Sequence, residues 1–204
     1  MKIIRAGTND IDVFSESELS FGACCFFTGD KLHRYFFEID GREATLFTNT
    51  KLYIPQAIDE FLYYSGFIAS IKDKEGNILL TRTPNTPYLC EINKLQPSQF
   101  YINEKKLENC KKWIKRPEDI FVPITMKDRK TILLDGHTRV RAAIDLGYTA
   151  VYVYPDKCDV GSILAFVEES IRRQINNVSD MELLSDEAYE LKWRSFCNNF
   201  FKHV

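Results

Sequence analysis

One stretch near the middle of the chain, residues 130–153 (KTILLDGHTRVRAAIDLGYTAVYV), constrains the fold more than any other. Residues 131–134 form a short apolar run that is typical of a buried strand, and an Asp-Gly pair then interrupts the run with turn chemistry. Apolar residues next recur at helical spacing over 138–146, and Gly147 fits a left-handed helix end. A second β-rich run follows at 150–153. The order of strand, turn, helix and strand predicts a βαβ unit.

The turn before this helix concentrates polar and basic residues. A helix that follows a glycine turn directs free backbone N–H groups and the positive end of its dipole outward, which suits an anion. Thr138 can cap the helix, and the Arg139 guanidinium can hold phosphate oxygens in a bidentate manner; a helix-surface ion pair is the alternative for Arg139. The predicted phosphate-binding residues are Gly136, His137, Thr138, Arg139 and Arg141.

Composition narrows the class of protein. Hydrophobic residues make up 45% of the 204 residues, which supports a packed core. The net charge of -2 argues against a protein that coats nucleic acid generally, so a DNA-binding patch would have to be local. No apolar run has membrane-spanning length and the start lacks a signal peptide's apolar region, so we expect a cytoplasmic protein. The spacing of the six cysteines fits no metal site, and we expect reduced thiols.

Turn signals divide the chain into three parts. Residues 1–82 predict a β-rich module with one helix, in which Asp40-Gly41 joins two strands through a type I′ turn. The segment TPNTP at 83–87 is the best domain boundary. A second domain is expected at 88–157, with Asn103 capping a helix, and a C-terminal helical extension at 158–204. The predicted fold class is α+β.

Residues 89–154 resemble the ParB/sulfiredoxin superfamily. The residues that carry the resemblance are LQPSQ at 95–99, VPI at 122–124, and LDGHTRVRAAIDLG at 134–147, followed by VYVY. The resemblance covers about a third of the chain and implies a mixed sheet with flanking helices. Residues 1–82 lie outside it.

The family's branches differ at the turn. Sulfiredoxins resemble Gly-Cys-His-Arg there and use the cysteine as nucleophile, whereas this chain has His137 at that position. Partition ParB proteins resemble Gly-Glu-Arg-Arg and bind CTP and DNA. A third branch uses a nucleotide to phosphorylate free serine and keeps Asp-Gly-x-x-Arg, which Asp135, Gly136 and Arg139 match. The resemblance therefore implies a nucleotide triphosphate or diphosphate with Mg²⁺ as the ligand.

A protein catalyses phosphoryl transfer mainly by positioning the reactants and neutralising charge. Three residues are candidates for this catalysis. Asp135 can hold Mg²⁺ or orient Arg139, with a plain turn residue as the alternative. His137 can bind phosphate or act as acid or base, and an exposed turn histidine is the alternative. Glu104 lies roughly where the branch that phosphorylates free serine has its catalytic glutamate, so it is a candidate base for an acceptor hydroxyl. The alternative is that Glu104 is a first-turn glutamate that complements the helix dipole.

Three functions follow from these residues, in order of preference. The first is a nucleotide-binding protein, with phosphotransferase or NTPase activity on a small molecule. The second is a DNA-binding ParB-like nuclease or partition-type protein, for which the lysine-rich segment 105–116 could contact the DNA backbone. The third is a non-catalytic interaction module. The sequence leaves the acceptor substrate, the choice of nucleotide and the oligomeric state open.

Overall fold

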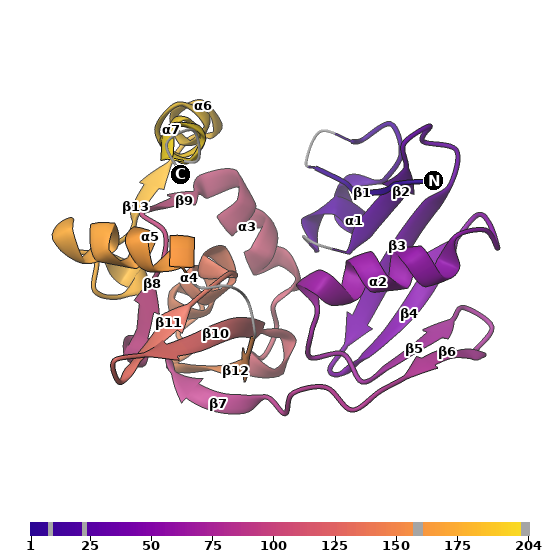
Figure 1. The fold of residues 1–204 in the computed structure, drawn as a ribbon, viewed down its shortest axis with the longest axis horizontal. Helices are drawn as coiled ribbons and strands as arrows, with labels where there is room; N and C mark the ends of the chain where they lie inside the picture. The colour runs from indigo at the N-terminus through magenta and orange to yellow at the C-terminus, as the bar shows by residue number, and fades with distance from the viewer. Residues whose placement is uncertain (8–9, 22–23, 157–160, 201–204) are drawn as a thin grey trace. The chain divides into compact units, whose positions relative to one another are not determined.

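The computed structural model describes residues 1–7, 10–21, 24–156 and 161–200 and divides the chain into two compact units, Met1–Thr86 and Pro87–Val204. Helices and mixed sheets occur in both, so the fold class is α+β (Figure 1). The boundary between the units falls inside the proline-rich segment 83–87. Each unit has its own sheet.

The first unit is a six-stranded sheet in the order β1-β2-β3-β4-β5-β6. All neighbouring strands are antiparallel except β4 and β5, which are parallel and are connected through α2. The described residues of this unit contain two α-helices rather than the predicted one, because a capping box at Ser15 and Glu18 starts a five-residue helix. The elements are β1 (Ile3–Arg5), α1 (Glu16–Ser20), β2 (Cys25–Thr28), β3 (Arg34–Asp40), β4 (Glu43–Thr48), α2 (Ile54–Tyr64), β5 (Ser70–Asp73) and β6 (Ile78–Thr81).

Aromatic residues form the core of the first unit. The buried rings of Phe37 on β3 and Phe61 on α2 stack with centroids 4.1 Å apart and an interplanar angle of 1°. Phe26 on β2 meets the edge of both rings. These three rings therefore stabilise the contact between α2 and the sheet.

The predicted β3–β4 hairpin is confirmed, but its turn differs from the prediction. Asp40 pairs with Glu43, so the two-residue loop is Gly41-Arg42 instead of Asp40-Gly41. Gly41 has a φ of 58° and Arg42 is not among the residues with positive φ, which is the pattern of a type II′ turn rather than type I′.

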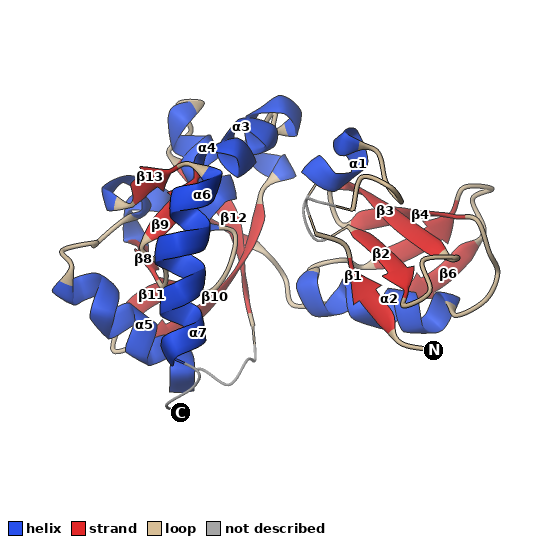
Figure 2. Cartoon of the chain, turned by 90° about the horizontal axis from the view of Figure 1, so that it is seen from above, coloured by secondary structure: helices blue, strands red, loops and turns tan. Residues whose placement is uncertain are grey.

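The second unit is built on a five-stranded sheet in the order β7-β12-β10-β11-β8, with a two-stranded pair β13-β9 beside it. Its strands are β7 (Tyr88–Glu91), β8 (Leu95–Pro97), β9 (Tyr101–Asn103), β10 (Phe121–Lys127), β11 (Lys130–Leu133), β12 (Ala150–Pro155) and β13 (Glu182–Leu184). Its α-helices are α3 (Glu104–Trp113), α4 (His137–Asp145), α5 (Gly161–Arg172), α6 (Asp186–Tyr189) and α7 (Ser195–Phe200). A π-helical turn, Glu190–Arg194, joins α6 to α7, and the three run on as one helix (Figure 2).

The predicted strand–helix–strand stretch is present, but it is not a βαβ unit. β10 lies between β11 and β12, antiparallel to β11 and parallel to β12. The parallel neighbours β10 and β12 are therefore joined by a crossover that contains both β11 and α4. Local sequence periodicity gives no information about this insertion of one strand between two others.

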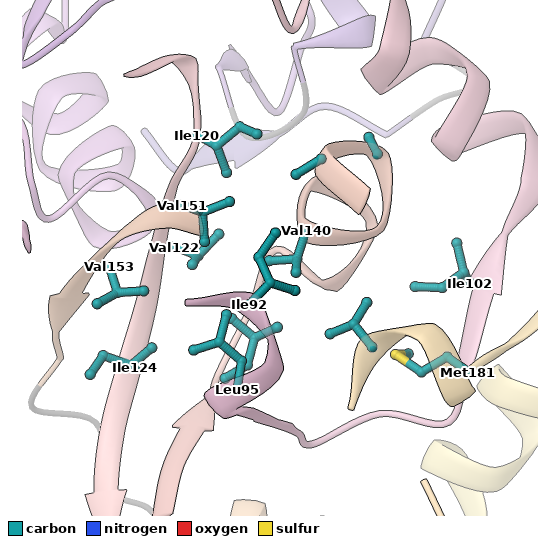
Figure 3. Packing of buried hydrophobic residues seen from close by; sticks show 14 of the residues in the cluster. Ile92, Leu95, Ile102, Ile120, Val122, Ile124, Val140, Val151, Val153 and Met181 are labelled. Atoms are coloured by element: carbon teal, nitrogen blue, oxygen red, sulfur yellow. The ribbon is translucent and has the colours of Figure 1, made fainter. Parts of the chain in front are cut away.

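The core of the second unit lies between the sheet and α4. Val140 projects from α4 toward the strand residues Val122 and Val151 (Figure 3). Leu107 on α3 and Phe166 on α5 belong to the same cluster. The segment 158–204, predicted as a separate extension, is thus part of this unit.

Candidate functional site

Gly136 forms the turn that leads into α4 and is required there for two reasons. Its φ of 83° and ψ of 18° are left-handed, a conformation that costs other residues roughly 1–2 kcal/mol. A Cβ at this position would lie 2.6 Å from Cγ1 of Val122 and 2.9 Å from Nη2 of Arg139. The guanidinium of Arg139 thus folds back over the glycine.

The first turn of α4 has no side-chain cap. Gly136 is the N-cap residue, and Thr138 is the second residue of the helix. The prediction that the Thr138 hydroxyl caps the helix is therefore wrong. Val140 N–H donates to the carbonyl of Gly136, whereas the preceding N–H groups of a helix have no intrahelical acceptor. The backbone N–H groups of His137, Thr138 and Arg139 therefore form the donor set predicted for an anion.

His137 is buried, with 2% exposure, and is not the exposed turn residue considered above. Its Nε2 accepts a 3.1 Å hydrogen bond from the backbone N–H of Ser98, whose hydroxyl donates to the carbonyl of Leu133. Burial lowers the pKa of His137 to about 4, the Asp135 charge acts in the opposite direction, and Arg139 lowers the pKa further. The ring is neutral near pH 7, with its proton on Nδ1, and Nε2 is not available for proton transfer.

Nδ1 of His137 is buried and has no hydrogen-bond partner among the described residues. A buried N–H without an acceptor is unfavourable by about 1–3 kcal/mol, and a ligand oxygen at this place would remove that cost. Nε2 is already bonded to Ser98, so Nδ1 is the imidazole nitrogen with hydrogen-bonding capacity left.

Arg139 is held by two protein groups. Its Nη1 donates to the carbonyl of Phe121 at 2.9 Å, and its Nη2 lies 3.4 Å from Oδ2 of Asp135. The Asp135 side chain is 62% exposed and that of Arg139 is 25% exposed, so this ion pair is partly screened by water. Asp135 thus orients Arg139, and the guanidinium keeps further N–H donors beyond these two bonds.

Two predicted residues do not join this group. Arg141 is two residues beyond Arg139, which places it on another face of the helix. Its Nε lies 3.2 Å from Oδ1 of Asp145, and its Nη1 donates to the carbonyl of Met181. Glu104 is exposed in the first turn of α3, and no contact among the described residues connects it with Asp135 or His137. The structure does not bring Arg141 together with Arg139, and Glu104 has the position of a residue that complements the helix dipole.

Two further residues, which contact each other, were not predicted as members of this site, although Lys106 belongs to the lysine-rich segment 105–116 considered for DNA contact. Tyr189 on α6 lies under the ammonium of Lys106, whose Nζ is 5.5 Å from the centre of the ring. Burial raises the pKa of Tyr189 to about 12, the neighbouring Cys197 adds to the increase, Arg194 opposes it, and the Asp135 charge contributes again. Helical spacing could have drawn attention to Lys106, but no sequence signal connects Tyr189 to the turn at Asp135.

Three basic residues of α3 and the segment after it have carboxylate partners. Lys105 lies 3.8 Å from Oδ2 of Asp186, and Lys111 contacts both Glu108 and Asp145. Arg116 pairs with Asp119 at 3.1 Å. These neutralised charges weaken the case for a DNA-binding patch on this helix.

Two hollows lie away from this turn. One of about 400 Å³ is in the first unit, lined by Glu38, Ile39, Asp40, Glu43, Thr45 and Lys72. The other, of about 300 Å³, lies near the C-terminal end of α4, beside Ile144 and Tyr148. Among the described residues, no group of three or more His, Cys, Asp or Glu side chains is placed to hold a metal ion. No described helix combines the length and the apolar character needed to cross a membrane.

Comparison with known proteins assigns this chain to no family. No family model and no curated protein matches the sequence. Among solved structures, protein Atu1540 from Agrobacterium tumefaciens is similar at a TM-score of 0.35 and 19% identity, over 48% of this chain and 61% of that one. The match therefore spans about three fifths of that chain.

Proposed function

We propose that the second unit binds the phosphate groups of a nucleotide at the start of α4. One observation carries the proposal: the first turn of α4 presents N–H groups without a side-chain cap, next to a left-handed glycine and the guanidinium of Arg139. Backbone N–H groups, the helix dipole and an arginine fork together form a strong environment for phosphate. The buried Nδ1–H of His137 offers one more donor at the same turn.

The residues present also suit Mg²⁺ that arrives with a nucleotide. Such an ion is usually held by one or two carboxylates together with the substrate phosphates. Asp135 is an exposed carboxylate beside the proposed phosphate position, so it is the residue that would take this role. A bound Mg²⁺ would neutralise phosphate charge.

The resemblance to the ParB/sulfiredoxin superfamily supports a reaction as well as binding. We propose a phosphotransferase or NTPase that acts on a small molecule with a hydroxyl group, free serine being the first compound to test. His137 would act as a neutral hydrogen-bond donor through Nδ1 rather than as an acid or base through Nε2. The five described cysteines are thiols rather than disulfides, which suits the proposed cytoplasmic location.

Calorimetry with Mg²⁺ and ATP, ADP, CTP or GTP tests the binding. We expect the chain to select among these nucleotides, and Arg139→Ala to weaken binding at least tenfold, because a hydrogen bond to a charged group contributes about 1.5–3 kcal/mol. Arg141→Ala is the matched control, since it removes an arginine of the same helix whose bonds go to Asp145 and Met181. Nucleotide affinity should stay within threefold in that variant.

Two results would contradict the proposal. One is a wild-type chain that binds none of the four nucleotides, and the other is equal affinity in Arg139→Ala and wild type. Far-UV circular dichroism of both variants shows whether the fold is intact, since Arg139 also bonds to Phe121. In the first case, a non-catalytic interaction module becomes the better interpretation.

A further inference from the structure

The hollow of about 300 Å³ near the C-terminal end of α4 lies in the second unit and is built from three segments. One is a short 3₁₀ helix before β8 (Ile92–Lys94), and another is the end of α4 with the segment that leads to β12. The third is a 3₁₀ helix (Val178–Asp180) with the residue that precedes it. Among the described residues, no charged side chain lines this hollow, which distinguishes it from the turn at Gly136.

Hydrogen bonds within the protein hold the walls of this hollow in place. The backbone N–H of Tyr148 donates to the carbonyl of Ala143 at 2.9 Å, and the Tyr148 hydroxyl donates to the carbonyl of Lys115 at 2.6 Å. The N–H of Ile92 donates to the carbonyl of Thr149 at 3.0 Å, which attaches the first 3₁₀ helix to the segment after α4. The hollow is therefore formed without a ligand, as sites for small molecules usually are.

Two asparagine amides that line the hollow have hydrogen-bonding capacity left. Asn93 is exposed, and its side chain makes no hydrogen bond within the described part of the chain. Asn177 uses only its side-chain oxygen, because Oδ1 accepts from the N–H of Ser179 at 2.9 Å and from the Ser179 hydroxyl at 2.6 Å. Nδ2 of Asn177 has no acceptor among the described residues. The two amides thus offer a ligand both donors and an acceptor without any charge.

Apolar and aromatic residues line the same hollow. They are Ile92, Ile144 and Tyr148. A planar heteroaromatic ring suits this combination, because its faces pack against apolar and aromatic side chains. The edge of a nucleobase carries a donor beside an acceptor, and an asparagine amide can bind such a pair in a bidentate manner. The volume is at the lower end of the roughly 300–1,000 Å³ of ligand pockets, which suits a single small ring system.

We propose that this hollow is a second ligand site and that it binds the base of a nucleoside, with the amides of Asn93 and Asn177 at the edge of the base. The described lining contains no cation, so phosphate takes no part in recognition here. The inference goes beyond the proposed phosphate binding and does not depend on it, because the residues that carry the two proposals are different.

Calorimetric titration of the full chain with adenosine, guanosine, cytidine and uridine tests this site, and ribose tests whether the sugar alone is recognised. We expect at least one nucleoside to bind and ribose not to bind. Asn93→Ala should weaken nucleoside binding about three- to tenfold, the effect of losing a hydrogen bond between neutral groups. Asn177→Asp keeps the oxygen that bonds to Ser179 but replaces the donor by a charged acceptor, so it should weaken binding at least tenfold. Asn176→Ala is the matched control, because that amide donates to the carbonyl of Gln174, and nucleoside affinity should stay unchanged.

Four results would overturn this inference while leaving the proposed function intact. They are a wild-type chain that binds none of the nucleosides, ribose binding as tight as nucleoside binding, wild-type affinity in either Asn93→Ala or Asn177→Asp, and loss of nucleoside binding in Arg139→Ala. The last result would place the base at the start of α4, whereas nucleosides carry no phosphate and should bind Arg139→Ala as they bind wild type. Asn93 is exposed, and aspartate caps a helix as well as asparagine does, so both variants should fold, which far-UV circular dichroism checks.

Discussion

The backbone N–H of Ser98 donates a 3.1 Å hydrogen bond to Nε2 of His137, 39 positions further along the chain. This bond attaches the segment after β8 to the first residue of α4 and requires the ring to be neutral. The Ser98 hydroxyl, bonded to Leu133, fixes the end of β11 at the same point. One buried imidazole thus determines how three segments meet at the candidate site.

The first prediction concerns pH. His137 has a pKa of about 4 when folded, below the 6.5 of the free side chain, so the unfolded chain binds the proton more readily. The contribution of neutral His137 to the free energy of unfolding is therefore fully present above about pH 6.5. It decreases by roughly 3 kcal/mol as the pH falls toward 4, since one pKa unit corresponds to about 1.4 kcal/mol. Urea unfolding at a series of pH values measures this slope. His137→Gln, whose side-chain oxygen can still accept from Ser98, should have a smaller slope; an identical slope in both proteins would show that His137 is not the titrating group.

The second prediction compares two left-handed glycines at the two ends of one helix. Gly136→Ala should lower the free energy of unfolding by roughly 2–4 kcal/mol, because it adds a clash with Val122 to the cost of the left-handed backbone. Gly147 has a φ of 82°, and a Cβ added there would meet nothing within 4 Å, so Gly147→Ala should cost only about 1 kcal/mol. Denaturant unfolding measures both. Equal losses would mean that close packing at Gly136 contributes nothing.

The third prediction concerns the start of α3. Asn103 accepts a 2.8 Å hydrogen bond from the N–H of Lys106 and donates to Asp186, and its side chain is buried. Asn103→Ala should lower the free energy of unfolding by about 2–3 kcal/mol, since it removes both the helix cap and the bond to a carboxylate. Asp186→Ala keeps the cap and removes the bond to Asn103 together with the exposed pair with Lys105, and it should cost less than about 1.5 kcal/mol. If the two variants are equally stable, the cap is of no importance.

The fourth prediction concerns the first unit. Phe61→Ala should destabilise that unit by about 3–5 kcal/mol, because it removes a fully buried ring that stacks on Phe37. Tyr63, two residues away on α2, is 78% exposed, and Tyr63→Ala should change stability by no more than about 0.5 kcal/mol. Thermal unfolding followed by near-UV circular dichroism distinguishes them. A small effect at Phe61 would contradict the stacking of this ring in the core.

Local features of the fold were predictable from the sequence, and long-range ones were not. The Asn103 cap and the left-handed Gly147 depend on residues within one turn, and both are confirmed. The burial of His137 depends on Ser98, which no periodicity connects to it. The separation of Arg141 from Arg139 was predictable, because helical geometry alone places residues two positions apart on different faces.

The parallel pairing of β9 with β13 also determines when the second unit can be completed during synthesis. The bond from Asn103 to Asp186 at this junction spans 83 positions. A nascent chain that ends before β13 lacks the only partner of β9 in the described sheets, and it also lacks Tyr189. On the ribosome the first unit has all of its described strands long before then, so we expect the second unit to be completed last.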